Sequence, residues 1–380
     1  MSENNFVDYD IHGLVGIRLT NPADSDTLAV TRQLGPLRVP SLARDPDIII
    51  RFEKHIPLPN LKYLGLNNAG FTDDGFYILK SKKSPAKVKI PFDEIGTTCE
   101  IVCESGLRAV PLLIAILNLT LLKKDCIPLH ASAYAYHNNG ILVTGWSKGG
   151  KTESLLAFAT HGADYIGDEW VILTRDGERM FGLPEPVTVW DWQLKQLPKL
   201  HKQLKSSDSL IFKSINMANS LQRRIGSGKL KNSLPARLLR EALPALNRQL
   251  HINLPPEDIF TKGALTLASR PDKLFFVMSH KDPTISVEHW DSGDITRRML
   301  HSVYYEQYPF FENYQTFKFA FPESQNDFLD NVREIQSDIL TNALKNKEAY
   351  RVLHPYPVSL EGLYKAMEPY CRNIPEINTQ

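Results

Sequence analysis

Eight consecutive residues, between an apolar segment and a helical one, have the composition of a loop that binds phosphate groups. They are Gly145, Trp146, Ser147, Lys148, Gly149, Gly150, Lys151 and Thr152, and we call them the glycine-rich loop. A polyphosphate needs many inward-pointing N–H donors, which glycines and a helix N-terminus supply. In this P-loop pattern Lys151 lies along the β- and γ-phosphates and the Thr152 hydroxyl holds Mg²⁺. The sequence therefore predicts a site for Mg²⁺ and a nucleoside triphosphate.

Two acidic residues follow the loop at the end of a second apolar segment. Asp168 comes sixteen residues after Thr152 and is followed directly by Glu169. A carboxylate at this point reaches either the metal ion or a hydroxyl group that enters beside the γ-phosphate, so Asp168 is a candidate Mg²⁺ ligand and a candidate general base. An Asp-Glu pair at a strand end is also a common solvated turn. With the glycine-rich loop upstream, we interpret both acids as site residues.

A histidine, His130, precedes the loop in a segment that we expect to pair with the strand entering it. Residues 127–136 form an alternating extended run, and a turn at 137–140 returns the chain into 141–144. This pattern predicts a β-hairpin with His130 on the partner strand. The histidine then either faces the phosphates or is a hydrogen-bonded core residue, since its neighbours are apolar.

Three segments around these residues resemble the catalytic domain of the HPr serine kinase/phosphorylase family: 128–133, 140–156 and 162–169. The family places a histidine at the start of the hairpin, a P-loop followed by Glu, and a pair of acids after a strand. The residues at matching positions are His130, Lys151, Thr152, Glu153, Asp168 and Glu169. The close match covers residues 128–172.

The resemblance implies the fold that this family shares with ATP-dependent phosphoenolpyruvate carboxykinases, an α/β fold with a mixed central sheet. It implies an ATP-dependent kinase that transfers a γ-phosphoryl group to a hydroxyl, with a serine of a protein or peptide as the first expectation. His130, Asp168 and Glu169 would then be catalytic, the loop and Glu153 would bind the nucleotide, and Thr152 and Asp168 would hold the metal. Because members of the family form hexamers, a homo-oligomer is also expected.

The chain departs from the family at three points. Lys148 stands where the family usually has glycine, Glu169 replaces an aspartate, and the family's glycine-containing RGLG stretch has no match. Phosphorolysis and the bacterial phosphocarrier substrate are therefore not implied. A kinase for a small-molecule hydroxyl and a nucleotide-gated sensor without catalysis remain alternatives, whereas a carboxykinase would need a metal-binding His/Lys set that we do not find.

The pattern of elements divides the chain into four expected parts. Residues 1–106 contain short extended runs between turns and indicate a β-rich N-terminal domain. Residues 107–193 contain the core with the glycine-rich loop, residues 194–262 a basic helical insertion, and residues 263–380 the rest of the core and C-terminal helices. The breaks expected within the helical insertion are Pro198, Gly226, Gly228, Pro235, Pro244 and Pro255.

Positive charge is concentrated in residues 195–250, although the net charge of the chain is only +1. This segment has twelve Lys/Arg and two Asp/Glu, a local charge of +10, so the remainder is acidic. Four of the basic residues flank a glycine-containing turn: Arg223, Arg224, Lys229 and Lys231. The segment is either a set of solvated helix faces or a docking surface for an anionic partner. Aromatic residues do not alternate with the basic ones, which argues against nucleic acid.

The composition of the 380 residues, 42% hydrophobic and 23% charged, is typical of a globular protein. Four cysteines lack the spacing of a zinc site, so we expect buried thiols in a reducing compartment. The N-terminus has neither a basic nor an apolar run, and the longest apolar stretch, 109–122, is too short to cross a bilayer. We therefore expect a cytoplasmic protein.

Overall fold

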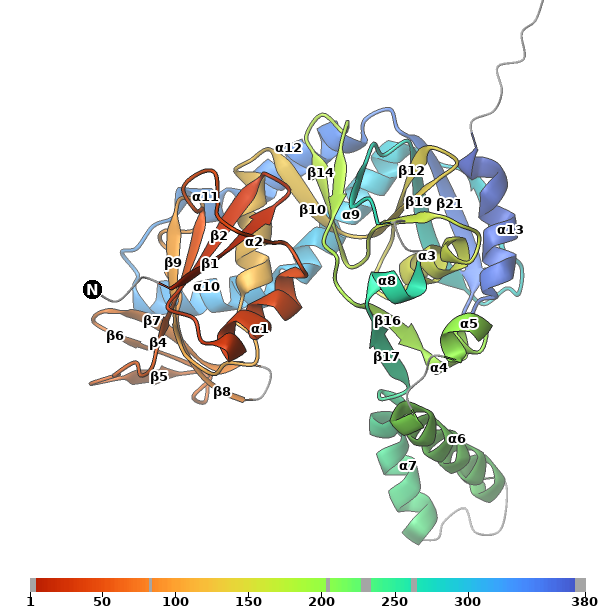
Figure 1. Cartoon of the computed structure of the whole chain (residues 1–380), viewed down its shortest axis with the longest axis horizontal. Coiled ribbons are helices and arrows are strands. Elements are labelled where there is room, and N and C mark those ends of the chain that lie inside the picture. Colours follow the sequence, from red (N-terminus) through yellow and green to blue (C-terminus); the bar gives the residue numbers. More distant parts are fainter. Residues whose placement is uncertain (1–4, 82–83, 203–205, 227–233, 261–264, 373–380) are drawn as a thin grey trace, which may run out of the picture.

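The chain folds into two lobes and a protruding pair of helices (Figure 1). The computed structural model describes residues 5–81, 84–202, 206–226, 234–260 and 265–372. One lobe contains the N-terminal strands and the other the glycine-rich loop, with α9 (Ser292–Glu306) and α12 (Val332–Leu344) between them. The architecture is α/β with mixed sheets, as the sequence predicts.

The N-terminal lobe is built on a nine-stranded sheet. In spatial order its strands are β3 (Arg38–Val39), β1 (Phe6–Ile11), β2 (Val15–Thr20), β4 (Ile48–Glu53), β9 (Cys99–Glu104), β8 (Ser84–Lys89), β7 (Gly75–Ser81), β6 (Ala69–Thr72) and β5 (Lys62–Leu64). Strand β4 pairs in parallel with β2 and β9, and the other pairs are antiparallel. Helices α1 (Asp24–Leu34) and α2 (Leu113–Leu122) share the apolar core of this sheet.

Helix α10 (Tyr308–Ala320) belongs to the C-terminal half of the sequence but packs in the N-terminal lobe (Figure 1). Its Phe310, Tyr314 and Phe317 surround the fully buried Phe92, with ring centroids 5.2 to 5.8 Å from that of Phe92. Aromatic rings at such separations contribute beyond their buried area. The core of the N-terminal lobe therefore contains residues from both halves of the chain.

Asn326, the N-cap of α11 (Asp327–Asp330), joins the same two halves. Its Nδ2 donates to the carbonyl oxygens of Phe92 and Ile95, each at 2.8 Å, and its Oδ1 accepts the N–H of Leu329 at 3.1 Å. The side chain is 8% exposed, so its removal leaves buried polar groups without partners.

We expect Asn326→Ala to lower the free energy of unfolding by about 2 kcal/mol, because a lost cap and unsatisfied buried carbonyls each destabilise. Urea unfolding followed by circular dichroism checks this. The control is Asn342→Ala, since Asn342 is exposed and bonds only within α12; it should change stability by less than about 0.5 kcal/mol. Equal effects of the two variants would contradict the prediction.

The second lobe contains the six-stranded sheet that carries the glycine-rich loop. In spatial order its strands are β13 (Asp164–Gly167), β11 (Ser132–Tyr136), β12 (Asn139–Thr144), β19 (Lys273–His280), β21 (Glu348–Pro355) and β20 (Ser286–His289). Strands β12, β19 and β21 are parallel, and the outer strands are antiparallel to their neighbours. Helices α3 (Lys151–Ala159) and α13 (Leu360–Cys371) pack against each other in the core of this sheet.

A second, antiparallel sheet lies beside it. Its strands are β10 (Cys126–His130), β14 (Trp170–Thr174), β15 (Met180–Gly182) and β18 (Ala268–Ser269). The interpretation of residues 127–136 as one strand is therefore wrong: β10 pairs with β14, whereas β11 pairs with β12 and β13. The chain changes sheets at the fully buried Ala131, whose N–H donates to the Glu169 carbonyl oxygen at 3.2 Å. Alternating hydrophobicity cannot indicate such a change, because both strands are buried.

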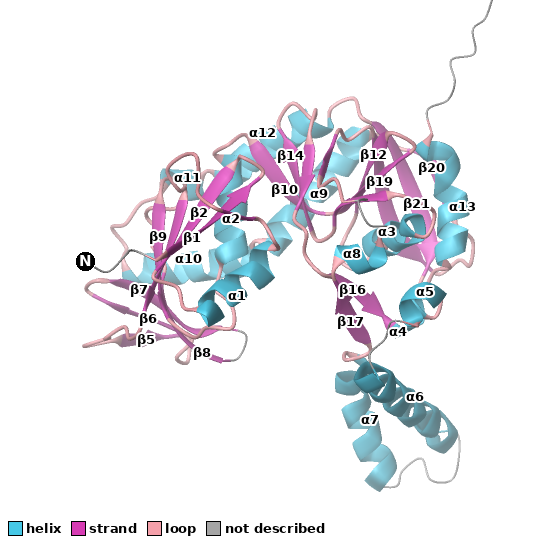
Figure 2. Cartoon of the chain, viewed as in Figure 1, coloured by secondary structure: helices cyan, strands magenta, loops and turns pink. Residues whose placement is uncertain are grey.

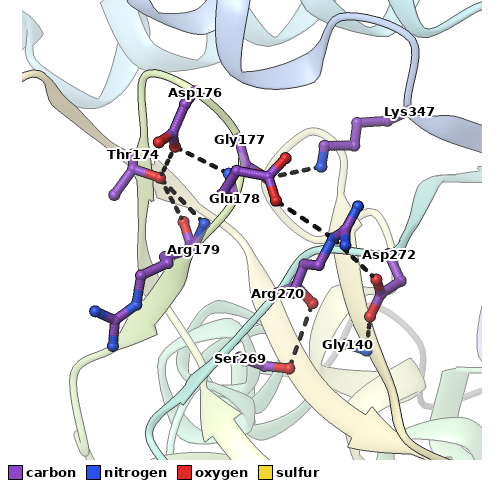
Figure 3. A network of polar contacts seen from close by, with 10 residues as sticks. All are labelled: Gly140, Thr174, Asp176, Gly177, Glu178, Arg179, Ser269, Arg270, Asp272 and Lys347. Atoms are coloured by element: carbon purple, nitrogen blue, oxygen red, sulfur yellow. Dashed lines mark hydrogen bonds and ion pairs between the residues drawn. The ribbon is translucent and has the colours of Figure 1, made fainter.

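A polar network joins the two sheets at the end of β12 opposite the glycine-rich loop (Figure 3). Arg270 Nε lies 3.6 Å from a carboxylate oxygen of Glu178 and 3.4 Å from one of Asp272. The other oxygen of Asp272 accepts the N–H of Gly140 at 2.8 Å, and Lys347 donates to a carbonyl of the β14–β15 turn at 2.7 Å. Exposed ion pairs are worth about 0–1 kcal/mol each, so the network fixes the ends of the strands more than it stabilises the fold.

The described part of residues 194–262 includes a helical hairpin that protrudes from this lobe, at the bottom of Figure 2. Strands β16 (Val187–Trp190) and β17 (His251–Leu254) form its antiparallel base, and α6 (Ser206–Gly226) and α7 (Leu234–Asn247) form its two arms. The short helices nearby are α4 (Asp191–Leu194), α5 (Pro198–His201) and α8 (Pro256–Ile259). Among the described residues, we find no helix with both the length and the apolar composition needed to cross a membrane.

Two of the helix breaks expected in this region are wrong. Pro235 lies in the first turn of α7, where its missing N–H removes no intrahelical bond, and Pro244 lies within the same helix. Gly226 is the last described residue of α6, so the break expected there is not tested. The expected turn residues Gly228, Lys229 and Lys231 lie outside the described residues, as do the side chains of Arg223 and Arg224.

Candidate functional site

The glycine-rich loop follows β12 and leads into α3, as the sequence predicts. Gly145 and Gly150 have φ values of 154° and 114°, which side chains rarely allow. A Cβ on Gly145 would lie 2.5 Å from the Val277 carbonyl oxygen, and one on Gly150 would lie 2.2 Å from His354 Nε2. Both glycines are therefore required by close contacts with the neighbouring strands β19 and β21.

His354, which the sequence analysis did not identify, supports the loop from β21. The ring is fully buried, with Nε2 2.7 Å from the Gly149 carbonyl oxygen and Nδ1 2.8 Å from that of Pro355. It thereby fixes the backbone immediately before α3, where the first turn presents its unpaired N–H groups.

Lys151 lies inside the curve of the loop. Its side chain is buried, and Nζ donates to the carbonyl oxygens of Gly145 at 3.3 Å and Trp146 at 3.0 Å. Burial lowers the pKa of the ammonium group, although nearby carboxylates including Asp168 oppose this effect. A cation held only by neutral carbonyl groups is available to an anion that enters the loop.

Asp168 and Thr152 lie side by side, as expected for a shared site. Thr152 Oγ1 is 3.1 Å and 3.3 Å from the two carboxylate oxygens of Asp168. The Ser132 hydroxyl also donates to this carboxylate, and the Asp168 N–H donates to the Tyr165 hydroxyl at 3.0 Å. Asp168 is 2% exposed, and burial, with repulsion from Glu169, raises its pKa to about 6. It is thus ionised at neutral pH but able to accept a proton.

This pair fits a Mg²⁺ ion bound together with a nucleotide. Magnesium sites for phosphate transfer use one or two carboxylates and complete their octahedron with phosphate oxygens and water. Thr152 and Asp168 supply a hydroxyl and a carboxylate in contact with each other. Within the described residues no cluster of three His, Cys, Asp or Glu side chains has the arrangement of a metal site. The cation would therefore depend on the nucleotide for further ligands.

His130 is held between two carboxylates. Its Nε2 is 2.9 Å from Glu169 Oε2, and its Nδ1 is 2.7 Å from Glu306 Oε1. The histidine lies at the end of β10 and not on the hairpin strand β11 that we expected. Glu306 ends α9, 176 positions from His130, and no local pattern could have indicated it.

The charge of His130 follows from this arrangement. Burial lowers the pKa of the ring, but the hydrogen bonds with Glu169 and Glu306 outweigh that effect and raise it to about 9. The same contact with His130 lowers the pKa of Glu169. At neutral pH the site therefore contains an imidazolium between two carboxylates.

We expect NMR titration of the His130 ring to give a midpoint near pH 9. Since this pKa exceeds the value of about 6.5 in unfolded chains, the protonated ring stabilises the fold fully below pH 6.5, and this contribution is lost as the pH rises through 9. Glu306→Gln should lower the midpoint, because one carboxylate is removed. Glu312→Gln, on the exposed face of α10, should leave it unchanged. A wild-type midpoint near 6.5 would contradict the arrangement.

The remaining predicted residues lie around the loop in different environments. Lys148 is exposed, with a left-handed φ of 61°, and Ser147 is partly exposed. Trp146 is 49% exposed and stacks at a tilt on Tyr305, with ring centroids 4.9 Å apart. Glu153 is buried beside the loop, and its carboxylate contacts Gln193 and not the residues that Asp168 and Glu169 contact. Its Oε1 accepts Gln193 Nε2 at 3.0 Å, and burial raises its pKa.

One cavity of about 680 Å³ connects these residues. It is lined by the glycine-rich loop, His130 and Glu169, and also by residues from the base of the helical hairpin. This volume lies within the range of about 300–1,000 Å³ that is usual for small-molecule sites. Asp168 does not line the cavity itself, but its carboxylate contacts the hydroxyl of Thr152, which does.

Comparison of the chain with family models and with curated proteins finds no match. The resemblance to the HPr serine kinase/phosphorylase family therefore depends on the motifs within residues 128–172.

Proposed function

We propose that the protein is a Mg²⁺-dependent kinase that transfers the γ-phosphoryl group of ATP to a hydroxyl group. The observation that carries this proposal is the contact between the Thr152 hydroxyl and the buried Asp168 carboxylate, next to Lys151 in its glycine-rich loop. A loop that only binds phosphate needs no buried carboxylate with a raised pKa at its γ-phosphate end. The mixed sheet around β12 also agrees with the HPr kinase-like fold that we propose.

In this proposal the backbone N–H groups of the loop and Lys151 bind the phosphates, and catalysis depends on positioning and on charge neutralisation. Thr152 and Asp168 would hold the Mg²⁺ ion, which would supply charge neutralisation at the phosphate oxygens. The acceptor hydroxyl gives its proton to Asp168 as its oxygen bonds to the γ-phosphorus. The bond between the γ-phosphorus and the oxygen that bridges to the β-phosphate breaks, and the nucleoside diphosphate leaves with that oxygen.

His130 and Glu169 have supporting roles in the same mechanism. The imidazolium lies close enough to Lys151 to repel it, so the two cations share the region where phosphate charge accumulates. Glu306 fixes the ring at Nδ1, and Glu169 meets it at Nε2. An anionic group that enters the cavity therefore meets His130 and Lys151 together.

For the acceptor we propose a hydroxyl on an anionic partner, with a serine of a protein or peptide as the first choice and a small metabolite as the second. Basic side chains are exposed on the short helix α5 and on the hairpin arm α6, namely Lys199 and Lys202 at α5 and Lys213 on α6. A basic surface near the site raises the local concentration of an acidic partner. Such a surface loses its effect when salt screens it.

The proposal is tested by measuring nucleotide binding and nucleotide turnover in the same preparation. We expect Mg²⁺-ATP to bind and to be converted to ADP when a cell extract containing acceptors is added. A nucleotide-gated sensor would instead bind tightly and release ADP at no appreciable rate with any addition. Binding without turnover would therefore contradict the kinase proposal and favour the sensor.

A further inference from the structure

The lining of the cavity includes residues that are distant in sequence from the glycine-rich loop. Among them are Trp190, Trp192, Leu250 and Tyr356, which come from β16, α4, the end of the hairpin and the segment after β21. These residues belong neither to the loop nor to the resemblance. They add three aromatic side chains to a lining that is otherwise mostly polar.

Two of these aromatic side chains form a corner. The rings of Trp192 and Tyr356 are nearly perpendicular, with centroids 5.7 Å apart and an angle of 79° between their planes. Tyr356 is 52% exposed, and Trp192 is partly exposed. Core aromatic residues would be covered by other side chains, so a corner that remains accessible inside a cavity has free surface for a flat, apolar group.

The aromatic corner is held at a fixed position relative to the loop. Gln193 donates to Glu153, which follows Thr152 in α3, at 3.0 Å, and its Oε1 accepts the N–H of Trp190 at 2.8 Å. Gln193 is 1% exposed. One buried side chain thus connects the first turn of α3 with the segment that carries both tryptophans.

Glu153 connects the two groups of lining residues and so gives the direction of a ligand. It follows Thr152 of the glycine-rich loop, and its carboxylate accepts a hydrogen bond from Gln193, the neighbour of Trp192. A nucleotide whose terminal phosphates contact Lys151 and Thr152 then extends past Glu153 toward the aromatic corner. The polar rim there comes from the hairpin, through Asn216 on α6 and Asn247 on α7.

From this geometry we infer that Trp192 and Tyr356 form the subsite for the nucleoside base of the bound nucleotide, and that the hairpin base forms the rim of this subsite. The inference rests on the proposed function, because the glycine-rich loop sets the direction of the nucleotide. It gives residues 194–262 a role in nucleotide recognition in addition to the proposed docking of an acceptor. The group that this subsite would bind is a planar heterocycle. Such bases stack on aromatic side chains whatever their identity, because every base has a π-face.

The test compares two probes by isothermal titration calorimetry in the presence of Mg²⁺, namely ATP and inorganic tripolyphosphate. Trp192→Ala and Tyr356→Ala should each weaken ATP binding about tenfold, the value expected for loss of one base–aromatic contact, and should leave the tripolyphosphate affinity unchanged. Trp192→Phe, which retains an aromatic wall, should recover most of the ATP affinity. Tyr63→Ala, at a 62% exposed tyrosine on β5, is the matched control for Tyr356→Ala.

Unchanged ATP affinity in both alanine variants would overturn the inference, and so would an equal loss for both probes. Because Tyr356 is half exposed, we expect Tyr356→Ala to fold. If Trp192→Ala unfolds, the ATP affinity of Tyr356→Ala alone therefore tests the subsite. Failure of the proposed function has a different signature. A wild-type protein that binds ATP through Trp192 and Tyr356 but transfers no phosphate would contradict the kinase and leave the base subsite standing, whereas one that binds neither probe would overturn both.

Discussion

Lys151→Ala is expected to reduce phosphoryl transfer by about a hundred- to a thousandfold, because a buried cation is removed from the place where negative charge develops. Its ammonium group is bound only to the carbonyl oxygens of Gly145 and Trp146, so its loss leaves no buried carboxylate without a partner. The fold should therefore survive. Labelled ATP with a cell extract as the source of acceptors measures the rate, and thermal unfolding measures the stability.

The control for Lys151→Ala is Lys365→Ala on α13, where the lysine is exposed and pairs only with Glu361. It should transfer phosphate at the wild-type rate. A folded Lys151→Ala protein with near-normal transfer would show that the glycine-rich loop is not where the γ-phosphate reacts.

Asp168→Asn is expected to reduce transfer by about a hundred- to ten-thousandfold, the range for loss of a general base. The amide occupies nearly the same volume as the carboxylate, and one oxygen remains to accept from Ser132 or Thr152. The protein should therefore stay folded. Because an amide cannot accept the proton of the hydroxyl, we expect the loss to appear in kcat. ATP should still bind through the glycine-rich loop, although with lower affinity.

The pH dependence adds an independent check on Asp168. Since its pKa is about 6 in the free protein, wild-type kcat/KM should fall as the pH is lowered through that value. The matched control is Asp164→Asn, a partly exposed aspartate at the start of β13. It should follow the wild-type profile. Equal losses in the two variants would mean that the effect of Asp168→Asn comes from disturbed packing near β13.

The local part of the site could be predicted from the sequence. The glycine-rich loop occupies one continuous segment with a strand before it and a helix after it, and this order is visible in the residue pattern. Asp168 was predicted because it closes the next strand, and its contact with Thr152 follows from the neighbouring ends of β11, β12 and β13.

The long-range part could not be predicted. Glu306, Gln193 and His354 each contact a site residue from an element whose position is set by tertiary packing. The local sequence at the end of a helix or strand does not indicate which distant loop that end will contact. The aromatic corner could not be predicted for a similar reason, because only the cavity distinguishes Trp192 from a tryptophan that packs in the core.

In the fold, likewise, the secondary structure could be predicted from local patterns and the tertiary packing could not. Alternating and apolar runs predicted the β-rich N-terminal part and the helices of the C-terminal half, but they could not indicate that α10 packs around Phe92. The change of sheets at Ala131 also lies outside any periodic pattern, because β10 and β11 are equally buried.

The central claim is tested most directly by identifying where the γ-phosphate of ATP goes. Wild-type protein, γ-labelled ATP, Mg²⁺ and a cell extract are incubated together, and mass spectrometry locates the transferred phosphate. Our account predicts label on a hydroxyl group, a serine before others, with wild-type protein and a loss of about a hundredfold or more with Asp168→Asn. Label appearing only as inorganic phosphate, or equal transfer by both proteins, would contradict it.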